Sequence, residues 1–443
     1  MAKIDRSSFT ENKRTMSGST SDMISNLPCN VLEKILTCLR LHAAVRTSVL
    51  SKKWRHIWTS LLQLVFDDMF YKECTMATRN NLMMTIYQVL LQHHGPILKF
   101  TVSLKALESC SLIDQLIDFV SKNGIQELTL HFYQAGPYKL PSSLFSCRGI
   151  TCLDLTSCVF QPPPGFKGFS RFLSLKLDKV VIAGDTLSSL ISACPLLERL
   201  TIQSSTRLCY LEIVALNLRF AQFVGLFSSV CFKSTPHLAK LSIHLLPSFW
   251  NLVLSEKRVP CKPLMLTGTF PVFELLELDY YHLKAMAAGG VPPNRHPNTL
   301  TNLKILKLYL ICFGKVDEIS MVLCLIRSCP NLEKIQLKIS ETVALDPVLE
   351  PLEVQGWSDI SLNQLREVEI HGVSGTRPEL DFIKLILAKS PILERLLIKL
   401  ESNEVFEELR ILKKLIGFKR LSPEAVIMFR NRNEVLRFCD GFE

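Results

Sequence analysis

The sequence predicts an α/β fold in which a small three-helix module precedes an irregular solenoid of short parallel strands. Two observations predict it: apolar residues at helical spacing over residues 22–66, and one strand template that recurs through residues 95–400. Hydrophobic residues make up 48% of the 443 residues and charged residues 21%, so we expect most of the chain to fold.

The first helix of the module is predicted to begin at Leu27-Pro28. Proline suits the first turn of a helix, because its missing N–H would have no partner there. The apolar residues that follow fall on one helical face: Val31, Leu32, Ile35, Leu36 and Leu39. The polar residues Glu33, Lys34 and Thr37 fall on the opposite face.

Two further helices are predicted, AAVRTSVL (43–50) and SKKWRHIWTSLL (51–62). Ser51 is placed to cap the third helix, in which Trp54 and Trp58 lie one turn apart. About forty residues cannot bury this much leucine and tryptophan by themselves. The module is therefore expected to dock against a partner, although an ordinary helical subdomain packed on the rest of the chain would show similar amphipathicity.

The strand template is L-x-x-L-x-L, in which alternation turns two apolar side chains inward and the residues between them outward. Copies begin at Ile125, Ile150, Phe172, Leu197, Leu208, Leu238, Phe273, Leu303, Leu332, Leu365 and Leu393. The short step from Leu197 to Leu208 is interpreted as an extra strand inside one repeat. The other steps lie near or slightly above the roughly 20–29 residues of leucine-rich repeats.

Helical segments precede several of these strands, and Pro195, Pro330 and Pro391 are each placed to end a helix just before its strand. Helix, proline and strand in regular succession are typical of a curved solenoid with a parallel sheet on its inner face. Outward residues of that sheet would contact a client protein, and four on adjacent repeats are the candidates: Lys307, Tyr309, Lys334 and Lys338. The lysines among them predict a basic stripe facing an acidic client, against the alternative of a solvated sheet face.

Catalytic, metal, membrane and nucleic-acid functions find no support in the sequence. It contains no catalytic motif, no C-x-x-C pair among its 15 cysteines, and no apolar run near the roughly 20 residues of a membrane span. The net charge of +10 is spread over 51 basic residues interleaved with 41 acidic ones, without a nucleic-acid-binding pattern. We therefore expect no cofactor, no catalytic residue and no metal ligand.

The sequence LPCNVLEKIL, followed by AVRTSVLSKKWRHIW, resembles an F-box. It is similar to the F-box of plant proteins that also carry leucine-rich repeats and an FBD segment. Cys29 replaces the usual acidic residue, and Arg40-Leu41-His42 replaces a usual proline turn, but neither change removes an apolar anchor. ALNLRFAQFVG (215–225) and residues 362–398 are similar to further parts of the same family, and residues 415–429 to its closing segment.

The resemblance implies an N-terminal three-helix F-box module followed by an irregular leucine-rich-repeat solenoid with a C-terminal FBD segment. The expected order is a disordered tail over 1–20, an F-box over 21–67, a linker helix region over 68–94, leucine-rich repeats over 95–360, and the FBD segment with the solenoid cap over 361–443.

The resemblance further implies a non-catalytic, substrate-recognition adaptor of an SCF-type (Skp-cullin-F-box) ubiquitin ligase. The F-box would bind a Skp-type adaptor and through it a cullin, and the repeats would capture a client for ubiquitin-dependent degradation in the cytoplasm and/or nucleus. Expected adaptor contacts are Leu27, Pro28, Ile35, Leu36, Leu39, Val45, Val49, Leu50, Trp54 and Trp58. Two alternatives stay open, a protein-binding scaffold and a small-ligand co-receptor, neither coupled to degradation.

Overall fold

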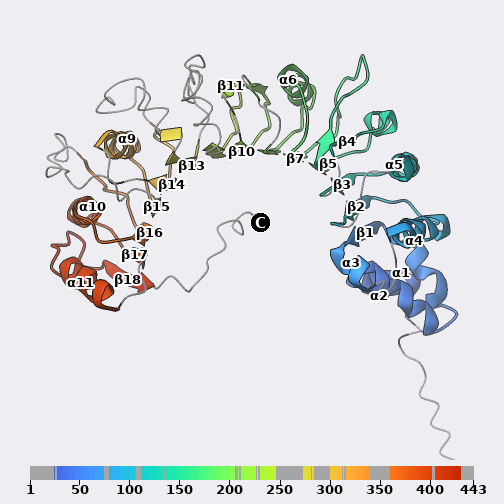
Figure 1. Cartoon of the computed structure of the whole chain (residues 1–443), viewed down its shortest axis with the longest axis horizontal. Coiled ribbons are helices and arrows are strands. Elements are labelled where there is room, and N and C mark those ends of the chain that lie inside the picture. Colours follow the sequence, from blue (N-terminus) through green and yellow to red (C-terminus); the bar gives the residue numbers. More distant parts are fainter. Residues whose placement is uncertain are drawn as a thin grey trace, which may run out of the picture. The chain divides into compact units, whose positions relative to one another are not determined.

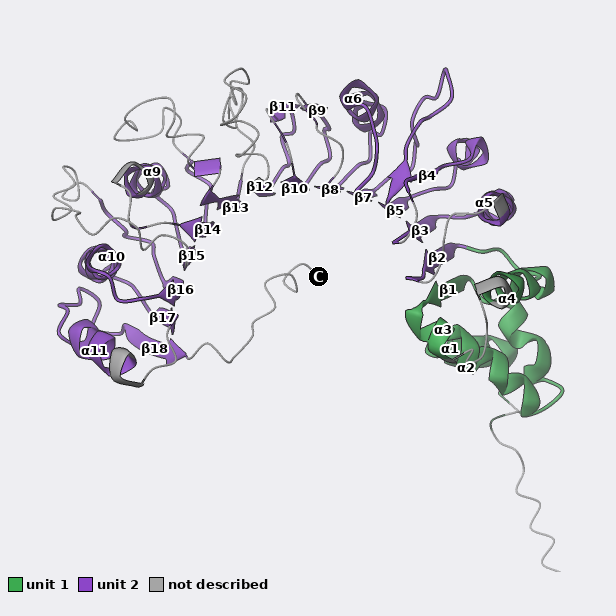
Figure 2. Ribbon diagram, in the orientation of Figure 1, with its two compact units in different colours: residues 1–97 green, residues 98–443 purple. Residues whose placement is uncertain are grey.

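The computed structural model describes residues 24, 27–73, 79–105, 111–133, 136–204, 208, 211–225, 227, 230–245, 273–280, 282–283, 300–311, 313, 316–339, 360–401 and 405–430. The predicted tail over 1–20 lies outside these residues. The chain divides into two compact units, residues 1–97 and residues 98–443 (Figure 2).

Unit 1 consists mainly of short helices. Their bounds are α1 Cys29–Thr37, α2 Leu41–Arg46, η1 Thr47–Val49, η2 Trp54–Ser60, α3 Asp68–Glu73 and α4 Arg79–Gln92, and the strand β1 spans Gln63–Asp67. Leu32, Leu36 and Ala44 have no exposed surface, and Trp54 and Trp58 are 3% and 4% exposed. These side chains form the core of the module.

The second and third helices differ from the prediction. The second helix changes from α to 3-10 geometry after Arg46. The third is the 3-10 helix η2, whose N-cap is Lys53 rather than Ser51 and has no side-chain hydrogen bond. The apolar spacing that predicted these helices does not distinguish 3-10 from α geometry over such short segments. The Oγ1 atoms of Thr47 and Thr59 donate to carbonyls three residues earlier, at 2.7 and 2.6 Å.

Unit 2 contains one large parallel sheet. Its strands pair in chain order: β2 Lys99–Ser103, β3 Glu127–His131, β5 Cys152–Thr156, β7 Ser174–Asp178, β8 Arg199–Gln203, β10 Phe220–Gly225, β12 Lys240–Leu245, β13 Leu275–Asp279, β14 Ile305–Ile311, β15 Lys334–Ile339, β16 Glu367–Val373, β17 Arg395–Leu400 and β18 Val426–Arg430. Each strand therefore has its sequence neighbours in the sheet beside it.

The helices of unit 2 connect successive strands. They are α5 Ser111–Lys122, η3 Ser142–Ser146, α6 Gly184–Ser192, α9 Val316–Arg327, α10 Arg377–Lys389 and α11 Val405–Ile416. Figure 1 shows α5, α6, α9 and α10 on the same side of the row of strands. The helices α6, α9 and α10 end shortly before Pro195, Pro330 and Pro391, as the sequence predicted.

The core of unit 2 lies between the sheet and this helical layer. Inward residues of neighbouring strands stand opposite one another, as in the series Leu278, Leu308, Leu337 and Ile370. Each of these four side chains is at most 1% exposed. The predicted alternation of inward and outward residues is therefore present along these strands.

Backbone hydrogen bonds join each repeat to the next in a recurring way. The carbonyl of Glu333 accepts from the N–H groups of Arg366 and Glu367, at 2.9 and 3.1 Å. The carbonyl of Leu98 accepts from Gln126 and Glu127 in the same manner, both at 2.9 Å. This two-to-one contact fixes where each strand begins against the strand before it.

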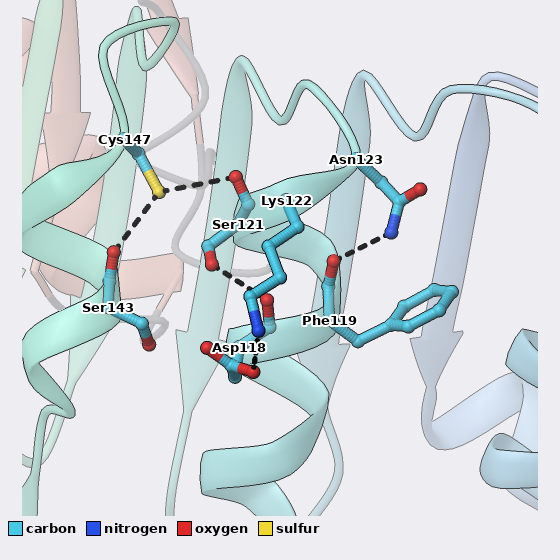
Figure 3. A network of polar contacts seen from close by, with 7 residues as sticks. All are labelled: Asp118, Phe119, Ser121, Lys122, Asn123, Ser143 and Cys147. Atoms are coloured by element: carbon cyan, nitrogen blue, oxygen red, sulfur yellow. Dashed lines mark hydrogen bonds and ion pairs between the residues drawn. The ribbon is translucent and has the colours of Figure 1, made fainter.

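Side-chain hydrogen bonds close the C-terminal end of α5 (Figure 3). Asn123 Nδ2 donates to the carbonyl of Phe119 and Ser121 Oγ to that of Asp118, both at 2.7 Å. These bonds add side-chain donors to two carbonyls in the last turns of the helix. Cys147 Sγ lies 3.6 Å from the carbonyl oxygen of Ser143, a residue of η3. This cysteine packs next to the C-terminal end of α5.

Several strands depart from the template. The copy at Leu208 leads into β9 (Leu211–Val214), which pairs with β11 (Val230–Ser234) in a separate small sheet, as expected for an extra strand. A second small sheet joins β4 (Tyr138–Lys139) to β6 (Cys158–Val159). The template did not include β2, β10 and β18, whose first inward residues are Phe100, Ala221 and Ile427.

Because the inward leucines hold the sheet to its helices, we predict that Leu337→Ala lowers the free energy of unfolding by about 2–5 kcal/mol. The adjacent outward change Gln336→Ala is the control, with an expected loss below about 1 kcal/mol. Urea unfolding followed by circular dichroism measures both. Equal losses would contradict the assignment of the two faces.

Candidate functional site

The ten residues predicted to contact an adaptor separate into three groups in unit 1. Leu36, Trp54 and Trp58 are buried in the core of the module. Leu27 and Val45 are half-buried, and Pro28 is exposed. The remaining four, here called the exposed apolar set, have the exposed fractions Ile35 37%, Leu39 41%, Val49 87% and Leu50 62%.

The exposed apolar set exists because the module has more apolar side chains than its core can cover. On α1, Leu32 and Leu36 are fully buried, whereas Ile35 remains in contact with water, as does Leu39 just after the helix. Burying one such side chain is worth about 1.5–3 kcal/mol. A group of them left exposed on so small a module is typical of a protein-binding surface.

The second candidate surface is the face of the large sheet that carries the outward residues. Their register places them in rows that run across the strands. The middle row contains Glu277, Lys307, Gln336 and Glu369 on β13 to β16. The row at the carboxyl ends of the strands, here called the C-terminal row, contains Tyr309, Lys338, His371, Lys399 and Arg430 on β14 to β18.

Two of the lysines predicted to face a client are paired with carboxylates on neighbouring strands. Lys307 Nζ lies 3.9 Å from Glu277 Oε2. Lys334 Nζ lies 2.6 Å from Glu369 Oε1 and 3.1 Å from Glu367 Oε2. Their charge is therefore partly neutralised within the sheet. Lys338 lies in the C-terminal row. That these lysines and Tyr309 contact a client stays a prediction.

The ion pairs around Glu369 shift the pKa values of the groups involved. His371, whose Nε2 lies 3.7 Å from Glu369 Oε2, and the Lys334 ammonium together lower the pKa of Glu369 to about 2, against the opposing effect of burial. Burial opposes the charge of Lys334 as well, but the two carboxylates nevertheless raise its pKa. Both groups are thus charged at neutral pH.

Imidazole and carboxylate groups meet in the same way elsewhere on this face. His131 Nε2 lies 3.0 Å from Asp154 Oδ1, and His244 Nε2 lies 2.7 Å from Glu277 Oε1. Although burial acts in the opposite sense, His131 and Lys176 lower the pKa of Asp154. The alternation of the strand template puts these histidines outward but does not reveal their acidic partners, because each partner stands on another strand and only the register brings the two together.

A polar pocket of about 310 Å³ lies at the amino ends of β13 to β15. It is lined by Glu274, Thr301, Asn302, Lys304, Asn331, Glu333 and Gln364. Asn331 Nδ2 donates to the carbonyl of Thr301 at 2.8 Å, and Lys304 Nζ lies 3.6 Å from Glu333 Oε1. The lining side chains thus bond to one another across repeats, which gives the pocket a structural role.

Several buried cysteines are poor nucleophiles. Burial raises the pKa of Cys147 to about 11 and the pKa of Cys158 and Cys329 to about 12. These thiols are protonated at neutral pH, and the thiolate is the reactive form.

Within the described ranges, no group of three or more histidine, cysteine or acidic side chains is arranged to hold a metal ion. In the same ranges no helix has the length and apolar character to cross a membrane.

Comparisons with known proteins match both units. A sequence model of the F-box domain matches residues 24–65. A second, described as "FBD-associated F-box protein At5g56370, LRR repeats", matches residues 113–337. The F-box/FBD/LRR-repeat protein At1g13570 of Arabidopsis thaliana is 36% identical over 423 residues, which cover 93% of this chain and 99% of the relative.

Two more distant relatives from the same plant also align over most of their length. The putative F-box/LRR-repeat protein At3g58920 is 25% identical and covers 92% of this chain and 99% of its own. F-box/LRR-repeat protein 13 is 25% identical, with coverage of 92% and 96%. The resemblance found in the sequence is therefore confirmed along nearly the whole chain.

The lowered pKa of Glu369 predicts a specific dependence of stability on pH. Its folded pKa of about 2 lies below the ordinary value of 4.5, so its stabilising contribution is fully present above pH 4.5 and is lost as the pH falls towards 2. The stability difference between the wild type and Glu369→Gln should therefore narrow over that interval. Urea unfolding at a series of pH values measures it.

Glu333→Gln is the matched control, because Glu333 also faces a lysine but in an exposed pair. Its smaller effect on stability should change little with pH, since exposed pairs contribute roughly 0–1 kcal/mol. A gap between wild type and Glu369→Gln that stays constant down to the lowest pH would contradict the assignment.

Proposed function

The chain belongs to the F-box/FBD/LRR-repeat family of plant proteins, and we propose that it is the substrate-recognition subunit of an SCF-type (Skp-cullin-F-box) ubiquitin ligase. F-box proteins of this kind act in substrate recognition by ubiquitin ligases. The observation that carries the proposal is the exposed apolar set within the matched F-box region.

The first step is the binding of a Skp-type adaptor by unit 1. F-box domains bind Skp-type adaptors, and here Ile35, Leu39, Val49 and Leu50 offer apolar area that the module itself leaves uncovered. Leu36, Trp54 and Trp58 support this surface from within, because they hold α1 and η2 in place. Through the adaptor, the chain would join a cullin.

The second step is the capture of a client by unit 2. We interpret the repeated helix and strand as a leucine-rich-repeat solenoid whose sheet face holds the client. The outward residues there carry charge and hydrogen-bonding groups at regular spacing, which suits a protein surface better than an apolar ligand. The chain is then a non-catalytic subunit acting in the cytoplasm and/or nucleus.

The chain would contribute to ubiquitin transfer by bringing the client close to the ligase scaffold. Docking the client on one unit and the ligase scaffold on the other turns a rare encounter into a nearly intramolecular reaction. The reactive thiolate that ubiquitin transfer requires would be supplied by a partner enzyme.

We predict that Val49→Ser combined with Leu50→Ser weakens binding of a purified Skp-type adaptor by at least about tenfold, because exposed apolar anchors carry much of the energy of an interface. The two side chains are 87% and 62% exposed, so their exchange should leave the fold intact. Isothermal titration calorimetry with the full chain measures the affinity.

The matched control is Leu409→Ser combined with Ile416→Ser on α11, where the side chains are 51% and 68% exposed. This variant removes comparable apolar area outside the F-box and should bind the adaptor as the wild type does. Failure of the folded wild type to bind would reject the ligase role and favour a protein-binding scaffold instead.

A further inference from the structure

The last repeat of unit 2 has the same helix and strand as the repeats before it but is covered on one side only. Figure 1 shows α11 and β18 at the C-terminal end of the row of helices and strands. The strand β17 is paired on both sides, with β16 and β18. Within the described ranges no strand pairs with the other edge of β18. The repeat array therefore has an open end at β18.

The inward side chains of β18 are incompletely covered. The register places Ile427 beside Leu396 and Phe429 beside Ile398. Leu396 and Ile398 have no exposed surface, whereas Ile427 and Phe429 are only half-buried. Val426, the first residue of the strand, is 58% exposed. Terminal repeats normally need a polar outer face for solubility, but β18 begins with four consecutive apolar residues.

The helix of the same repeat has an uncovered apolar side as well. On α11, the buried Ile411 side chain lies directly against Gly375 of the preceding repeat. Leu409 and Ile416 are 51% and 68% exposed, and helical geometry places them on the other side of α11. In α10, which has a repeat on either side, all apolar residues from 380 to 387 are buried. The exposed side of α11 thus lacks a neighbour of this kind.

The backbone of β18 offers hydrogen bonds along its free edge. The N–H of Val426 donates to the carbonyl of Glu394 at 2.9 Å, towards β17. Backbone groups of successive residues point to alternate sides of a strand, so those of Ile427 and Phe429 point to the free edge. Soluble proteins usually protect such edges with charged side chains, proline or bulges. The four apolar residues of β18 include none of these devices, so the edge can accept another strand.

We propose that β18 and α11 form a two-fold interface with the same elements of a second copy of this chain. A two-fold axis near Met428, perpendicular to the sheet, makes the two β18 strands antiparallel. Ile427 then stands opposite Phe429 of the second copy, and the two residues exchange both backbone hydrogen bonds. Inward side chains meet inward side chains, because the paired residues are an even number of positions apart. The two helical layers then lie on the same side of one continuous sheet.

The edge is complementary to itself, and its area suits a dimer. An isologous interface uses the same surface on both copies, so each copy supplies a strand of the required length and alternation. The exposed apolar side chains at this end are Leu409, Ile416, Leu421 and Val426. With the half-buried residues of β18 they offer roughly 500 Å² per copy, so a dimer would bury about 1,000 Å², the lower limit for a specific interface. We therefore expect a dimer that dissociates on dilution.

Sedimentation equilibrium of the full chain, over a dilution series from about 100 to 1 μM, tests the interface. The average mass should fall from near twice 50.2 kDa towards 50.2 kDa. Ile427→Pro removes an edge-facing N–H and leaves the pairing with β17 in place, so it should weaken the dimer at least about tenfold. Leu409→Ser with Ile416→Ser should weaken it too, because it removes apolar area from the interface.

The matched control is Met84→Ser with Leu91→Ser on α4, where the side chains are 57% and 76% exposed. It removes similar apolar area far from β18 in the sequence and should leave the dimer unchanged. A wild type that sediments as a monomer at every concentration would overturn the proposal and assign the open end to a different protein. Equal weakening in the control, or an undiminished dimer in folded Ile427→Pro, would overturn it as well.

Hydrogen exchange of the wild type provides a second measurement if Ile427→Pro impairs folding. The amides of Ile427 and Phe429 should exchange more slowly as the protein concentration rises, because the second copy would accept their hydrogen bonds. Exchange that is independent of concentration would contradict the proposed pairing.

This inference goes beyond the proposed function, and adaptor binding keeps the two apart. The variants leave the F-box region, residues 24–65, unchanged, so each should bind the Skp-type adaptor as the wild type does. A monomeric chain that binds the adaptor would reject the interface alone. A dimer that fails to bind the adaptor would reject the ligase role and retain the interface.

Discussion

Unit 2 depends on the burial of alternate apolar side chains, which neighbouring parallel strands present to the helical layer. Leu308, Leu337 and Ile370 face one another along consecutive strands, and each is fully or almost fully buried. Paired N–H groups at the start of each strand donate to one carbonyl of the repeat before it, which fixes the register. Every outward charge on the sheet, and every ion pair between strands, is positioned by this arrangement.

Sequence reasoning succeeded where the cause of structure is local. Alternating leucines and the prolines at 195, 330 and 391 marked strands and helix ends correctly, because side-chain alternation and the missing proline N–H act within a few residues. It failed where the cause is distant or the side chain unusual. The strand around Phe100 has phenylalanine where most copies of the template have leucine, and the apolar pattern of η2 does not distinguish a 3-10 helix from an α-helix over so short a segment.

The candidate surfaces were predictable in type but not in detail. The apolar pattern over residues 31–39 was visible in the sequence, but it did not show that Leu36 is buried where α1 contacts η2 while Leu39, after the helix, is exposed. The lysines at 307 and 334 were correctly placed outward, but their partners Glu277 and Glu369 come from strands about 30 residues away, a separation set by the repeat length. Register between repeats therefore determines which charges are available to a partner.

The division of labour between inward and outward positions has a consequence for how such chains diverge. An exchange at Lys338 or Gln336 alters what the surface presents, while the neighbouring Leu337 continues to hold the strand in place. Along each strand, the residues that define the surface thus alternate with the residues that form the core. Substitutions at the outward positions therefore change the chemistry of this face at little cost in stability.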